Sequence, residues 1–544
     1  MTTPLPVRVT ADHEREFYTV SEAAQLLDVS QATVWRWIAA NRLPAYRVGP
    51  RRIRIRKEDL ESVISPVQER WISVDPEKER DDIWASYDPE RMRQALRDSA
   101  GALAGVEREA LLADLRAGRV KDKDKGTEVR YQELIGKDIG GAVSGGLDSC
   151  TVTAWLREQG ARPHCFVVDL GQPDEANLDD VPRRMLACGA LEAAVIPGQA
   201  ALAQAGLKVI QAQARYEGGY WNTTGIARYV TTALIVRELE RRAIGVLYHG
   251  ATGRGNDQVR FQLATNMLAP RMQVYAPWRD PAFVDRFGGR AEMLAYCAEH
   301  GLPVRATVEK PYSTDANFLG LTHEAGKLES LCTPAAHVEP GMGVWAWDAP
   351  DRPTVLTVQW EAGVPVAIDG QKLPLVDLFH AANRIAGDNG VGIGVHVVEN
   401  RFVGIKSRGV YEAPGMELLG TTYAYLLQLV LDRRARDLYD GISRQIATQI
   451  YQGYWYDLAT TSALASLEPI LSLMTGTVAV RLYKGNLFFE GIEGAEYSLY
   501  SSDIASMERV GTFDHVDAEG FLNVLGVSAR NYADKQFKSL DRGE

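Results

Sequence analysis

The stretch Ser144-Gly145-Gly146-Leu147-Asp148-Ser149 decides the fold class, because it stands between a predicted strand at residues 139–143 and a predicted helix at residues 151–159. Its glycines let the backbone approach phosphate oxygens closely, and its serines add hydroxyl donors. The N-terminal end of the following helix favours negative charge. Asp148 repels phosphate, so we expect it to act through Mg²⁺ or to order the loop. No Walker A pattern fits the chain. These residues therefore predict a phosphate-binding loop at the end of a strand.

Short apolar runs and amphipathic stretches alternate after this loop. Residues 166–170 and 245–249 have the composition of buried strands, and residues 227–242 that of a helix. This alternation predicts a parallel sheet that binds ligands beyond the carboxyl ends of its strands. Gly140-Gly141 stands where a buried strand usually has bulky residues, so we expect a weak and loosely packed strand.

The chain after residue 301 changes character. Apolar runs at residues 354–360 and 364–369, and again at 478–483 and 487–490, are each separated by a glycine. They predict two hairpins in a second domain of α+β type. We expect five parts: a small module at 17–65, a charged, partly helical linker at 66–137, a nucleotide-binding domain at 138–300, the α+β domain at 301–519 and a polar helical tail at 520–544.

Composition limits the function classes. The 544 residues include 46% hydrophobic residues and carry a formal charge of −11, which excludes a disordered or fibrous chain and requires any nucleic-acid contact to be local. The scattered cysteines argue against a disulfide scaffold or a cysteine-based zinc site, and no apolar stretch of about 20 residues is present. We expect a cytoplasmic protein without a membrane partner or a resident metal centre.

The leading module combines helical signals with a basic run. A hydroxyl at Thr19 can cap a first helix, residues 31–40 predict a second helix, and the run to residue 57 alternates basic and apolar residues about a turn. A solvated charged hairpin is one interpretation. DNA binding is the other, because clustered arginines are what phosphate contact requires.

This module resembles the excisionase-type, MerR-like helix-turn-helix family at residues 18–24, Val29-Ser30, Thr33-Val34 and Leu43-Pro44. The resemblance implies a second helix in the major groove of double-stranded DNA and a wing on the backbone. The residues implied in DNA contact are Ser30, Gln31, Thr33, Arg36, Arg47, Arg51, Arg52 and Arg54.

A second polar constellation begins at His249-Gly250-Ala251-Thr252-Gly253-Arg254-Gly255-Asn256-Asp257 and ends at Phe261. It follows a predicted strand and is too polar for a core. Further polar runs lie at residues 312–317, 322–326, 398–401 and 406–415. Each run alone is typical of caps, turns and surface ion pairs.

In this order, the runs resemble the argininosuccinate synthase family over about residues 137–535, and residues 144–149 resemble its PP-loop. The resemblance implies ATP-dependent ligation of citrulline and aspartate, in arginine biosynthesis, through a citrullyl-adenylate. AMP and pyrophosphate would be released, with ATP and Mg²⁺ as cofactors. It also implies a homotetramer whose C-terminal tails embrace neighbouring subunits.

The resemblance implies roles by position. ATP would be bound by Ala142, Val143, Ser144, Gly145, Gly146, Leu147, Asp148, Ser149, Cys150, Val168, Gly250 and Asp315. Aspartate would be bound by Thr252, Asn256 and Asp257, whose carboxylate can attract an ammonium. Citrulline would be bound by Tyr220, Asn256, Arg260, Ser313, Thr322, Glu399 and Tyr411. Arg260 can fork onto a carboxylate, and Glu399 can accept from an amine or ureido group. Asp148, Asp257 and Arg260 are the expected catalytic residues.

Some positions depart from the family pattern. Gly225 replaces a citrulline-binding serine, and losing that hydrogen bond would cost about 1.5–3 kcal/mol. Thr223, Val143 and Cys150 also depart from it. His249 is either a general base or, more commonly for a histidine at a strand end, a structural residue. We expect Trp221, Tyr229 and Tyr248 to be packing residues.

Three functions remain open from the sequence. One is a working synthase with a fused DNA-binding module. Another is a DNA-binding regulator that uses a degraded synthase domain as a ligand sensor, which Gly225 and Gly140-Gly141 suggest. The third is a different PP-loop amidating or thiolating enzyme, against which the absence of cysteine pairs and of an N-terminal cysteine argues.

Overall fold

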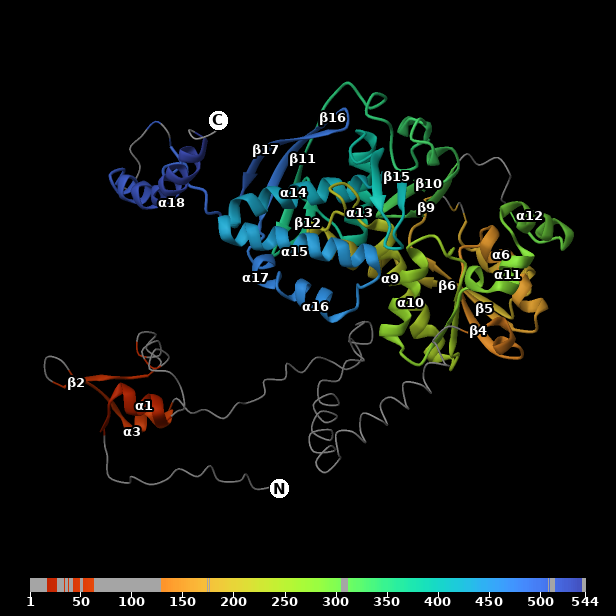
Figure 1. Ribbon diagram of the computed structural model, residues 1–544, viewed down its shortest axis with the longest axis horizontal. Coiled ribbons are helices and arrows are strands. Elements are labelled where there is room, and N and C mark those ends of the chain that lie inside the picture. The colour runs from red at the N-terminus through yellow and green to blue at the C-terminus, as the bar shows by residue number, and fades with distance from the viewer. Residues whose placement is uncertain are drawn as a thin grey trace. The chain divides into compact units, whose positions relative to one another are not determined.

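The computed structural model describes residues 17–26, 34, 38, 43–48, 52–62, 129–173, 175, 177–304, 312–506, 508 and 514–540. The chain divides into two compact units, residues 1–104 and 105–544 (Figure 1). The predicted helix at residues 31–40 lies outside the described residues, apart from the isolated positions Val34 and Ile38, and so does the predicted linker up to residue 128. So do the predicted DNA contacts Ser30, Gln31, Thr33, Arg36 and Arg51.

The first unit contains a three-stranded antiparallel sheet in the order β1-β3-β2. Its elements are β1 (Phe17–Tyr18), α1 (Val20–Leu26), β2 (Tyr46–Val48), β3 (Arg52–Arg56) and α3 (Lys57–Ser62). Thr19 caps α1 as expected: its hydroxyl accepts from the Glu22 backbone at 3.2 Å, and the Glu22 carboxylate accepts from the Thr19 backbone at 2.8 Å. The β2–β3 pair is the predicted wing, with Arg47 opposite Ile53.

The second unit begins with a parallel sheet in the order β6-β5-β4-β7-β8, as the alternating pattern predicts. Its strands are β4 (Asp138–Ala142), β5 (Arg162–Asp169), β6 (Glu192–Pro197), β7 (Val246–His249) and β8 (Gln273–Tyr275). The order reverses between β4 and β7, and the carboxyl end of such a reversal is where open α/β sheets bind ligands.

Helices cover both faces of this sheet. They are α6 (Leu147–Glu158), α7 (Asp180–Ala187), α8 (Gln199–Gln211), α9 (Thr223–Arg241), α10 (Asp257–Leu268), α11 (Pro281–Arg286) and α12 (Arg290–Glu299), with short 3₁₀ turns at Tyr131–Leu134 and Pro277–Arg279. Trp155 and Phe283 belong to the core on one face, whereas Leu202 and Ile235 belong to the core on the other, which continues into the second domain. Val129 and Leu134 are buried in the first of these cores, so packing begins before residue 138.

The glycine pair of β4 is tightly packed, which makes the expectation of loose packing wrong. A Cβ on Gly140 would lie 2.1 Å from a methyl carbon of Leu239, and one on Gly141 would lie 2.3 Å from the Tyr248 ring. Tyr248 is the neighbour of Gly141 on β7, and its hydroxyl lies 3.0 Å from the Thr153 hydroxyl. The large side chains of Leu239 and Tyr248 therefore fill the space that side chains at residues 140 and 141 would occupy.

The second domain contains two antiparallel sheets. A four-stranded sheet has the order β14-β15-β10-β9, from β9 (Ser313–Asn317), β10 (Gly320–Glu324), β14 (Val395–Asn400) and β15 (Lys406–Glu412). A five-stranded sheet has the order β13-β12-β11-β16-β17, from β11 (Thr354–Glu361), β12 (Val364–Ile368), β13 (Gln371–Lys372), β16 (Gly476–Tyr483) and β17 (Asn486–Glu493). The β11–β12 and β16–β17 pairs are the two predicted hairpins.

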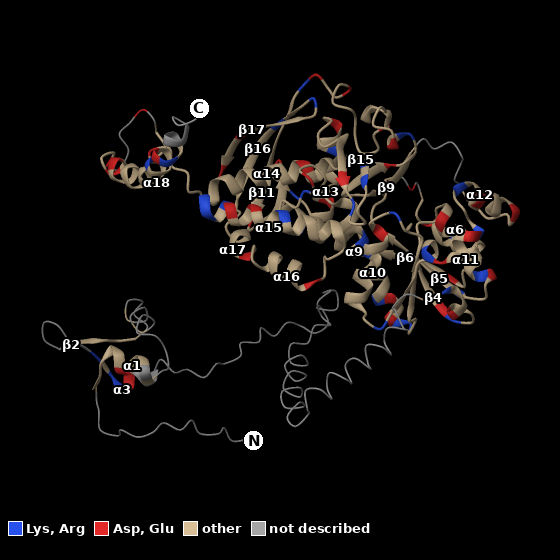
Figure 2. Ribbon diagram, in the orientation of Figure 1, with Lys and Arg blue, Asp and Glu red and all other residues tan. Residues whose placement is uncertain are grey.

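Helices of this domain are α13 (Leu375–Asp388), α14 (Pro414–Val430), α15 (Arg433–Gln452), α16 (Leu458–Ala465), α17 (Glu468–Leu471) and α18 (Asp517–Leu540), with 3₁₀ turns at Gly326–Glu329 and Ala335–His337. The helical tail is confirmed by α18. Acidic and basic residues are interspersed over this unit (Figure 2). Within the described residues, no helix has both the length and the apolar content to cross a membrane.

Candidate functional site

The phosphate-binding loop has the geometry that its sequence predicts. Gly145 adopts φ +73°, and a Cβ there would lie 2.9 Å from a Val181 methyl carbon, so this turn requires glycine. The Ser149 hydroxyl accepts from the Ser144 backbone at 3.0 Å, which ties the two ends of the loop together. Arg184 donates to the Gly145 carbonyl at 2.8 Å. The loop is thereby preshaped at the N-terminal end of α6, where anions bind.

The loop after β7 reaches the same place. Ala142 is paired with His249 in the register of β4 and β7, so the two loops begin side by side. A Cβ on Gly250 would lie only 3.2 Å from the Asp148 Cβ. The Val143 backbone donates to the Phe166 carbonyl at 3.1 Å, and Val168 lies two residues further along β5. Residues 142–150, Val168 and Gly250 therefore meet at the carboxyl edge of the sheet.

Asp148 lies at the centre of this edge. Its Oδ1 accepts from the Trp278 indole at 3.1 Å. Burial raises the pKa of Asp148, while the Trp278 hydrogen bond opposes that change. Among the described residues, no cluster of three or more His, Cys, Asp or Glu side chains forms a metal site.

A second group of predicted residues shares one face of the four-stranded sheet. Asp315 is opposite Thr322, and Thr322 is opposite Tyr411, so these residues form one row across β9, β10 and β15. Ser313, two residues before Asp315 on the same face of β9, is opposite Glu324 and exposed. Residues directly opposite on neighbouring strands point to the same face. Three separate polar runs of the sequence are thereby assembled on one surface.

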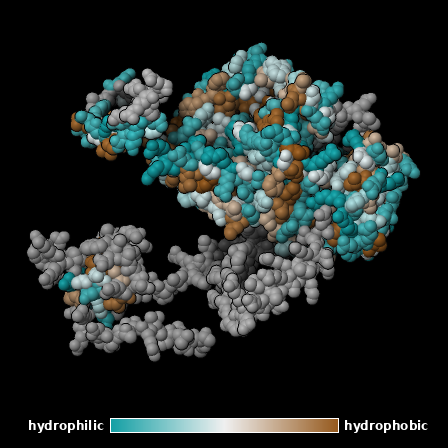
Figure 3. Space-filling model, viewed as in Figure 1, coloured by the Kyte–Doolittle hydropathy of each residue, from teal (hydrophilic) through white to brown (hydrophobic). Residues whose placement is uncertain are grey.

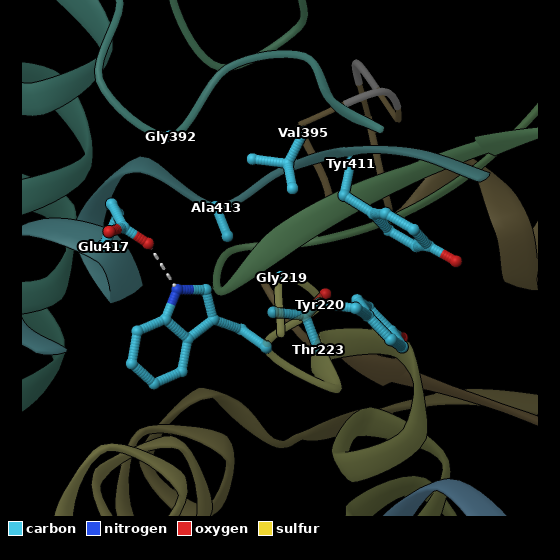
Figure 4. Close-up of a pocket in the computed structure, with 9 residues that line it drawn as sticks. Gly219, Tyr220, Thr223, Gly392, Val395, Tyr411, Ala413 and Glu417 are labelled. Carbon is cyan, nitrogen blue, oxygen red and sulfur yellow. Dashed lines mark hydrogen bonds between the residues drawn. The ribbon is translucent and has the colours of Figure 1, made fainter. Parts of the chain in front are cut away.

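Buried tyrosines and a carboxylate occupy one end of this surface. Glu399 is 5% exposed and accepts from the Tyr411 hydroxyl at 2.9 Å and from the Ser407 hydroxyl at 3.0 Å. The Tyr411 ring stacks on Tyr220 with centroids 4.1 Å apart. A pocket beside this pair is lined by Gly219, Tyr220, Trp221, Thr223, Gly392, Val395, Tyr411, Ala413 and Glu417 (Figure 4).

The start of α9 faces the same surface. The hydroxyls of Thr224 and Thr322 are 2.8 Å apart, and the Thr224 backbone donates to the Tyr220 hydroxyl at 3.0 Å. A Cβ on Gly225 would lie 3.4 Å from the Ile450 carbonyl oxygen of α15. The space beside Gly225 is therefore occupied partly by α15.

Asp257 joins the two groups through a largely buried ion-pair network. Its Oδ2 accepts from Arg228 Nε at 2.8 Å, and its Oδ1 accepts from Arg260 Nη1 at 2.7 Å. Arg228 also pairs with Asp315. Burial alone raises the pKa of Asp257, but the two guanidinium groups outweigh it and lower the pKa to about 2. Asp257 therefore stays ionised, and each oxygen retains one acceptor position for a substrate ammonium.

Arg260 is held by both α10 and α15. Its Nη2 donates to the Tyr451 carbonyl at 2.9 Å, and its side chain is 5% exposed. Thr252 lies on the exposed part of the loop, whereas the Asn256 amide is buried and accepts from the Phe402 backbone at 3.0 Å. The hairpin between β14 and β15 thus packs directly on the loop that carries Asn256.

His249 has the properties of a neutral buried side chain. It is 0% exposed and stacks on Phe261 with centroids 4.9 Å apart. Burial first, and the nearby Arg279 second, lower its pKa to about 3. Its Nδ1 accepts from the Ala251 backbone at 3.2 Å, so Nε2 carries the proton. This environment favours the structural interpretation over a general base. Trp221, Tyr229 and Tyr248 are buried, as expected of packing residues.

The wing of the first unit carries Arg47 on β2 and Arg52 and Arg54 on β3. Arg54 is opposite Tyr46, and Arg56 lies 4.7 Å from the Tyr46 ring centroid. Basic residues therefore occur in the sequence of both strands of this hairpin. The resulting concentration of positive charge is suited to contact with a phosphate backbone.

The sequence predictions missed several residues of this site. Arg228 lies within the predicted helix at residues 227–242 and received no predicted role, although it lies one helical turn after Thr224 on α9 and shares its face. Trp278 and Tyr451 gave no signal, because each is a single aromatic residue outside the polar runs, and such residues usually pack in a core. Their places depend on packing between elements that are distant in sequence.

Comparisons with known proteins agree with this geometry. Residues 139–303 match the arginosuccinate synthase N-terminal HUP domain, residues 312–532 match the arginosuccinate synthase C-terminal domain, and residues 17–65 match a helix-turn-helix domain. Argininosuccinate synthase of Rhodopirellula baltica is 41% identical over 392 residues, which are 72% of this chain and 96% of that protein. Argininosuccinate synthase of Thermotoga maritima is 36% identical over 394 residues, covering 70% of this chain and 94% of that protein.

Proposed function

The chain belongs to the argininosuccinate synthase family, and we propose that it ligates citrulline and aspartate at the site formed by residues 142–150, 250–260 and the β9–β10–β15 face. One observation carries this proposal. Asp257 begins the helix after the nucleotide-side loop and is joined through Arg228 to Asp315, which lies in the row with Thr322 and Tyr411. A nucleotide and an amino-acid substrate can therefore lie next to each other.

The proposed chemistry begins with activation of the ureido oxygen. This oxygen is a poor leaving group, so it attacks the α-phosphorus of ATP, forms a citrullyl-adenylate and releases pyrophosphate. The aspartate amine then displaces AMP from the ureido carbon, giving argininosuccinate. In our proposal the 144–149 loop binds the phosphates, while Thr252, Asn256 and Asp257 hold aspartate. Much of the rate then comes from positioning the reactants, and no nucleophilic triad is needed.

The citrulline end is proposed to use buried polar groups. Arg260 forms paired hydrogen bonds with the carboxylate of citrulline, and Glu399 accepts a hydrogen bond from its amine or ureido N–H. Tyr220 and Tyr411 enclose the apolar part of the substrate. Arg228 acts as a positioning residue, because it holds Asp257 and Asp315 in fixed relation.

Mg²⁺ fits this site as a metal carried by ATP. The protein supplies the Asp148 carboxylate beside the loop, and Mg²⁺ commonly binds through one or two carboxylates together with substrate phosphates and water. The ion would neutralise charge on the departing pyrophosphate.

A pyrophosphate-release assay tests the proposed function. With Mg-ATP, citrulline and aspartate, the full chain should release AMP and pyrophosphate in equal amounts. Argininosuccinate should form in the same amount, as measured by mass spectrometry. Omission of either amino acid should abolish steady-state turnover. Purified, folded protein that forms no AMP with Mg-ATP, citrulline and aspartate would contradict the proposal.

We also propose that the helix-turn-helix domain binds double-stranded DNA. Arg47, Arg52 and Arg54 on the β2–β3 hairpin support a backbone contact. The full chain should shift a mixed-sequence duplex in an electrophoretic assay, and its affinity should fall steeply with added salt. Replacing Arg52 and Arg54 together by glutamine should weaken binding, whereas unchanged affinity would contradict this use of the wing.

The sensor alternative receives less support from the structure. One reason for this alternative was the glycine pair of β4, which suggested a degraded domain. Those glycines pack against Leu239 and Tyr248 in a filled core, so this reason no longer holds. The alternative requires citrulline, aspartate or ATP to change DNA affinity in a protein without turnover. Titrating each ligand into the DNA-binding assay distinguishes it from a working enzyme.

We propose a homotetramer in which α18 packs against neighbouring subunits. Phe521, Leu522, Val524 and Leu525 of α18 are each more than half exposed, and this segment shows hydrophobic residues among hydrophilic ones (Figure 3). An exposed apolar stripe of this kind is favoured as an interface. Light scattering should give four times the chain mass of 60.0 kDa, and a monomer would contradict the proposal.

A further inference from the structure

Tyr451 lies near the end of α15 and inserts its ring among the proposed citrulline residues. The ring stacks on Tyr216 with centroids 3.7 Å apart and meets Tyr220 edge-on at 6.5 Å. The Arg260 guanidinium lies 5.2 Å from its ring centroid, while the Tyr451 carbonyl accepts from Arg260 Nη2 at 2.9 Å. These contacts fix both the backbone and the ring of Tyr451 against the site.

The Tyr451 hydroxyl is a buried polar group without a hydrogen-bond partner. The residue is 1% exposed, and the hydroxyl forms no hydrogen bond in the structure. Glu399 and Asn256 lie close enough to affect its ionisation. Burial first, and then the Glu399 carboxylate, raise the pKa of Tyr451, so the hydroxyl keeps its proton. A buried donor of this kind is costly unless something else accepts its hydrogen bond.

Tyr423 provides a comparison, because its hydroxyl is buried in the core and away from the proposed site. Tyr423 of α14 is also buried, and its hydroxyl also lacks a partner. Its ring packs on Trp360 with centroids 5.1 Å apart, and burial first, with Tyr439 second, raises the pKa of Tyr423. Those surroundings are core residues that offer nothing to a substrate. Tyr451 differs because a carboxylate, an amide and a guanidinium from different elements surround it.

The packing at Gly225 explains why α15, rather than α9, supplies a hydroxyl at this position. Gly225 has no side chain, and a Cβ there would lie 3.3 Å from Ile450 Cγ2. The turn of α9 that faces Arg260 therefore offers no hydroxyl at this position. The residue after Ile450 is Tyr451, so the helix that fills this space also brings a hydroxyl to the site.

We propose that the Tyr451 hydroxyl hydrogen-bonds citrulline beside Glu399 and is a further specificity-determining residue of the reaction. This inference rests on the proposed function, since it names another contact of the same citrulline site. The bound substrate completes the hydrogen bond that the protein leaves open. Truncating the hydroxyl then removes a substrate contact without breaking any bond within the protein.

Tyr451→Phe is the test, because phenylalanine keeps the ring contacts and removes the hydroxyl alone. The KM for citrulline and its Kd by calorimetry should rise about tenfold, which is the loss of one hydrogen bond. The KM values for aspartate and ATP should stay within about twofold, and the melting temperature should not fall.

Two matched variants control for buried tyrosine hydroxyls. Tyr423→Phe removes another buried tyrosine hydroxyl that lacks a partner, and it should leave all three KM values unchanged. Tyr439→Phe removes a hydroxyl on α15 that donates to the Gln211 carbonyl at 2.8 Å, so it should lower the melting temperature without raising the citrulline KM.

The outcomes separate the two proposals. An active wild-type chain with an unchanged citrulline KM in Tyr451→Phe would overturn the inference alone. Equal weakening of citrulline and aspartate, or loss of folding, would also overturn it, because either result indicates a structural role. A wild-type chain that neither binds citrulline nor turns over would overturn the proposed function itself, and this inference with it.

Discussion

Arg228 donates from Nε to Oδ2 of Asp257 at 2.8 Å, which ties α9 to the first turn of α10. The same guanidinium pairs with Asp315 on β9. The three side chains of this bridge are each at least two-thirds buried, so solvent screens it weakly. The bridge couples the nucleotide-binding domain to the sheet that carries Thr322 and Tyr411.

Arg228→Met should therefore reduce both stability and activity. Removing one partner of a buried ion pair leaves uncompensated carboxylates and costs about 3–5 kcal/mol. We expect kcat/KM to fall by at least about a hundredfold, since Asp257 and Asp315 lose their fixed relation. Urea unfolding and steady-state rates measure the two effects. Arg241→Met, at a more exposed position of the same helix, is the control and should change neither.

The two amino-acid substrates should respond to different substitutions. Thr252→Ala removes an exposed hydroxyl from the proposed aspartate site and should raise the aspartate KM about tenfold, with the citrulline KM unchanged. Glu399→Gln weakens a buried acceptor of the proposed citrulline site. It should raise the citrulline KM about tenfold and leave the aspartate KM unchanged. Each variant is the control for the other. Substitutions that raise both KM values alike would show that the assignment of the two sites is wrong.

His249 should make the stability of the fold depend on pH. Its pKa falls from the ordinary value of 6.5 to about 3 on folding, so the unfolded chain binds one more proton between these values. The stability due to this group is fully present above pH 6.5 and is lost as the pH falls toward 3, by about 1.4 kcal/mol per pH unit.

His249→Asn removes that dependence while keeping a polar side chain. Between pH 6.5 and 5, the wild-type chain should lose about 2 kcal/mol more than the variant in urea unfolding. His380→Asn, at an exposed position, should follow the wild-type curve. Parallel curves for wild type and His249→Asn would disprove the buried neutral state of His249.

Gly140→Ala should destabilise the parallel sheet. The added Cβ would lie 2.1 Å from a Leu239 methyl carbon, and overpacking of this kind costs about 1–3 kcal/mol. Gly245→Ala is the matched control, because a Cβ there meets nothing within 4 Å. Equal melting temperatures for the two variants would mean that the core around β4 is loose after all.

The chemistry of single loops was readable from the sequence. The phosphate-binding loop with a strand before it and a helix after it, the parallel sheet and the two hairpins were all predicted correctly, although α6 begins at Leu147, inside the predicted loop. These features depend on local residue types and on periodicity. The helix α9 begins at Thr223, earlier than its apolar pattern predicts, because its first turn is polar and faces the site.

Relations between distant segments were decided only by the tertiary structure. The row of Asp315, Thr322 and Tyr411 depends on strand register, and a shift of one residue would turn each side chain to the other face. The expectation about Gly140-Gly141 failed because Leu239 and Tyr248, which fill the space, come from other elements. Tyr451 reaches the site only because α15 packs beside Gly225. A sequence specifies which groups are available locally, whereas the packing of helices and strands determines which of them meet.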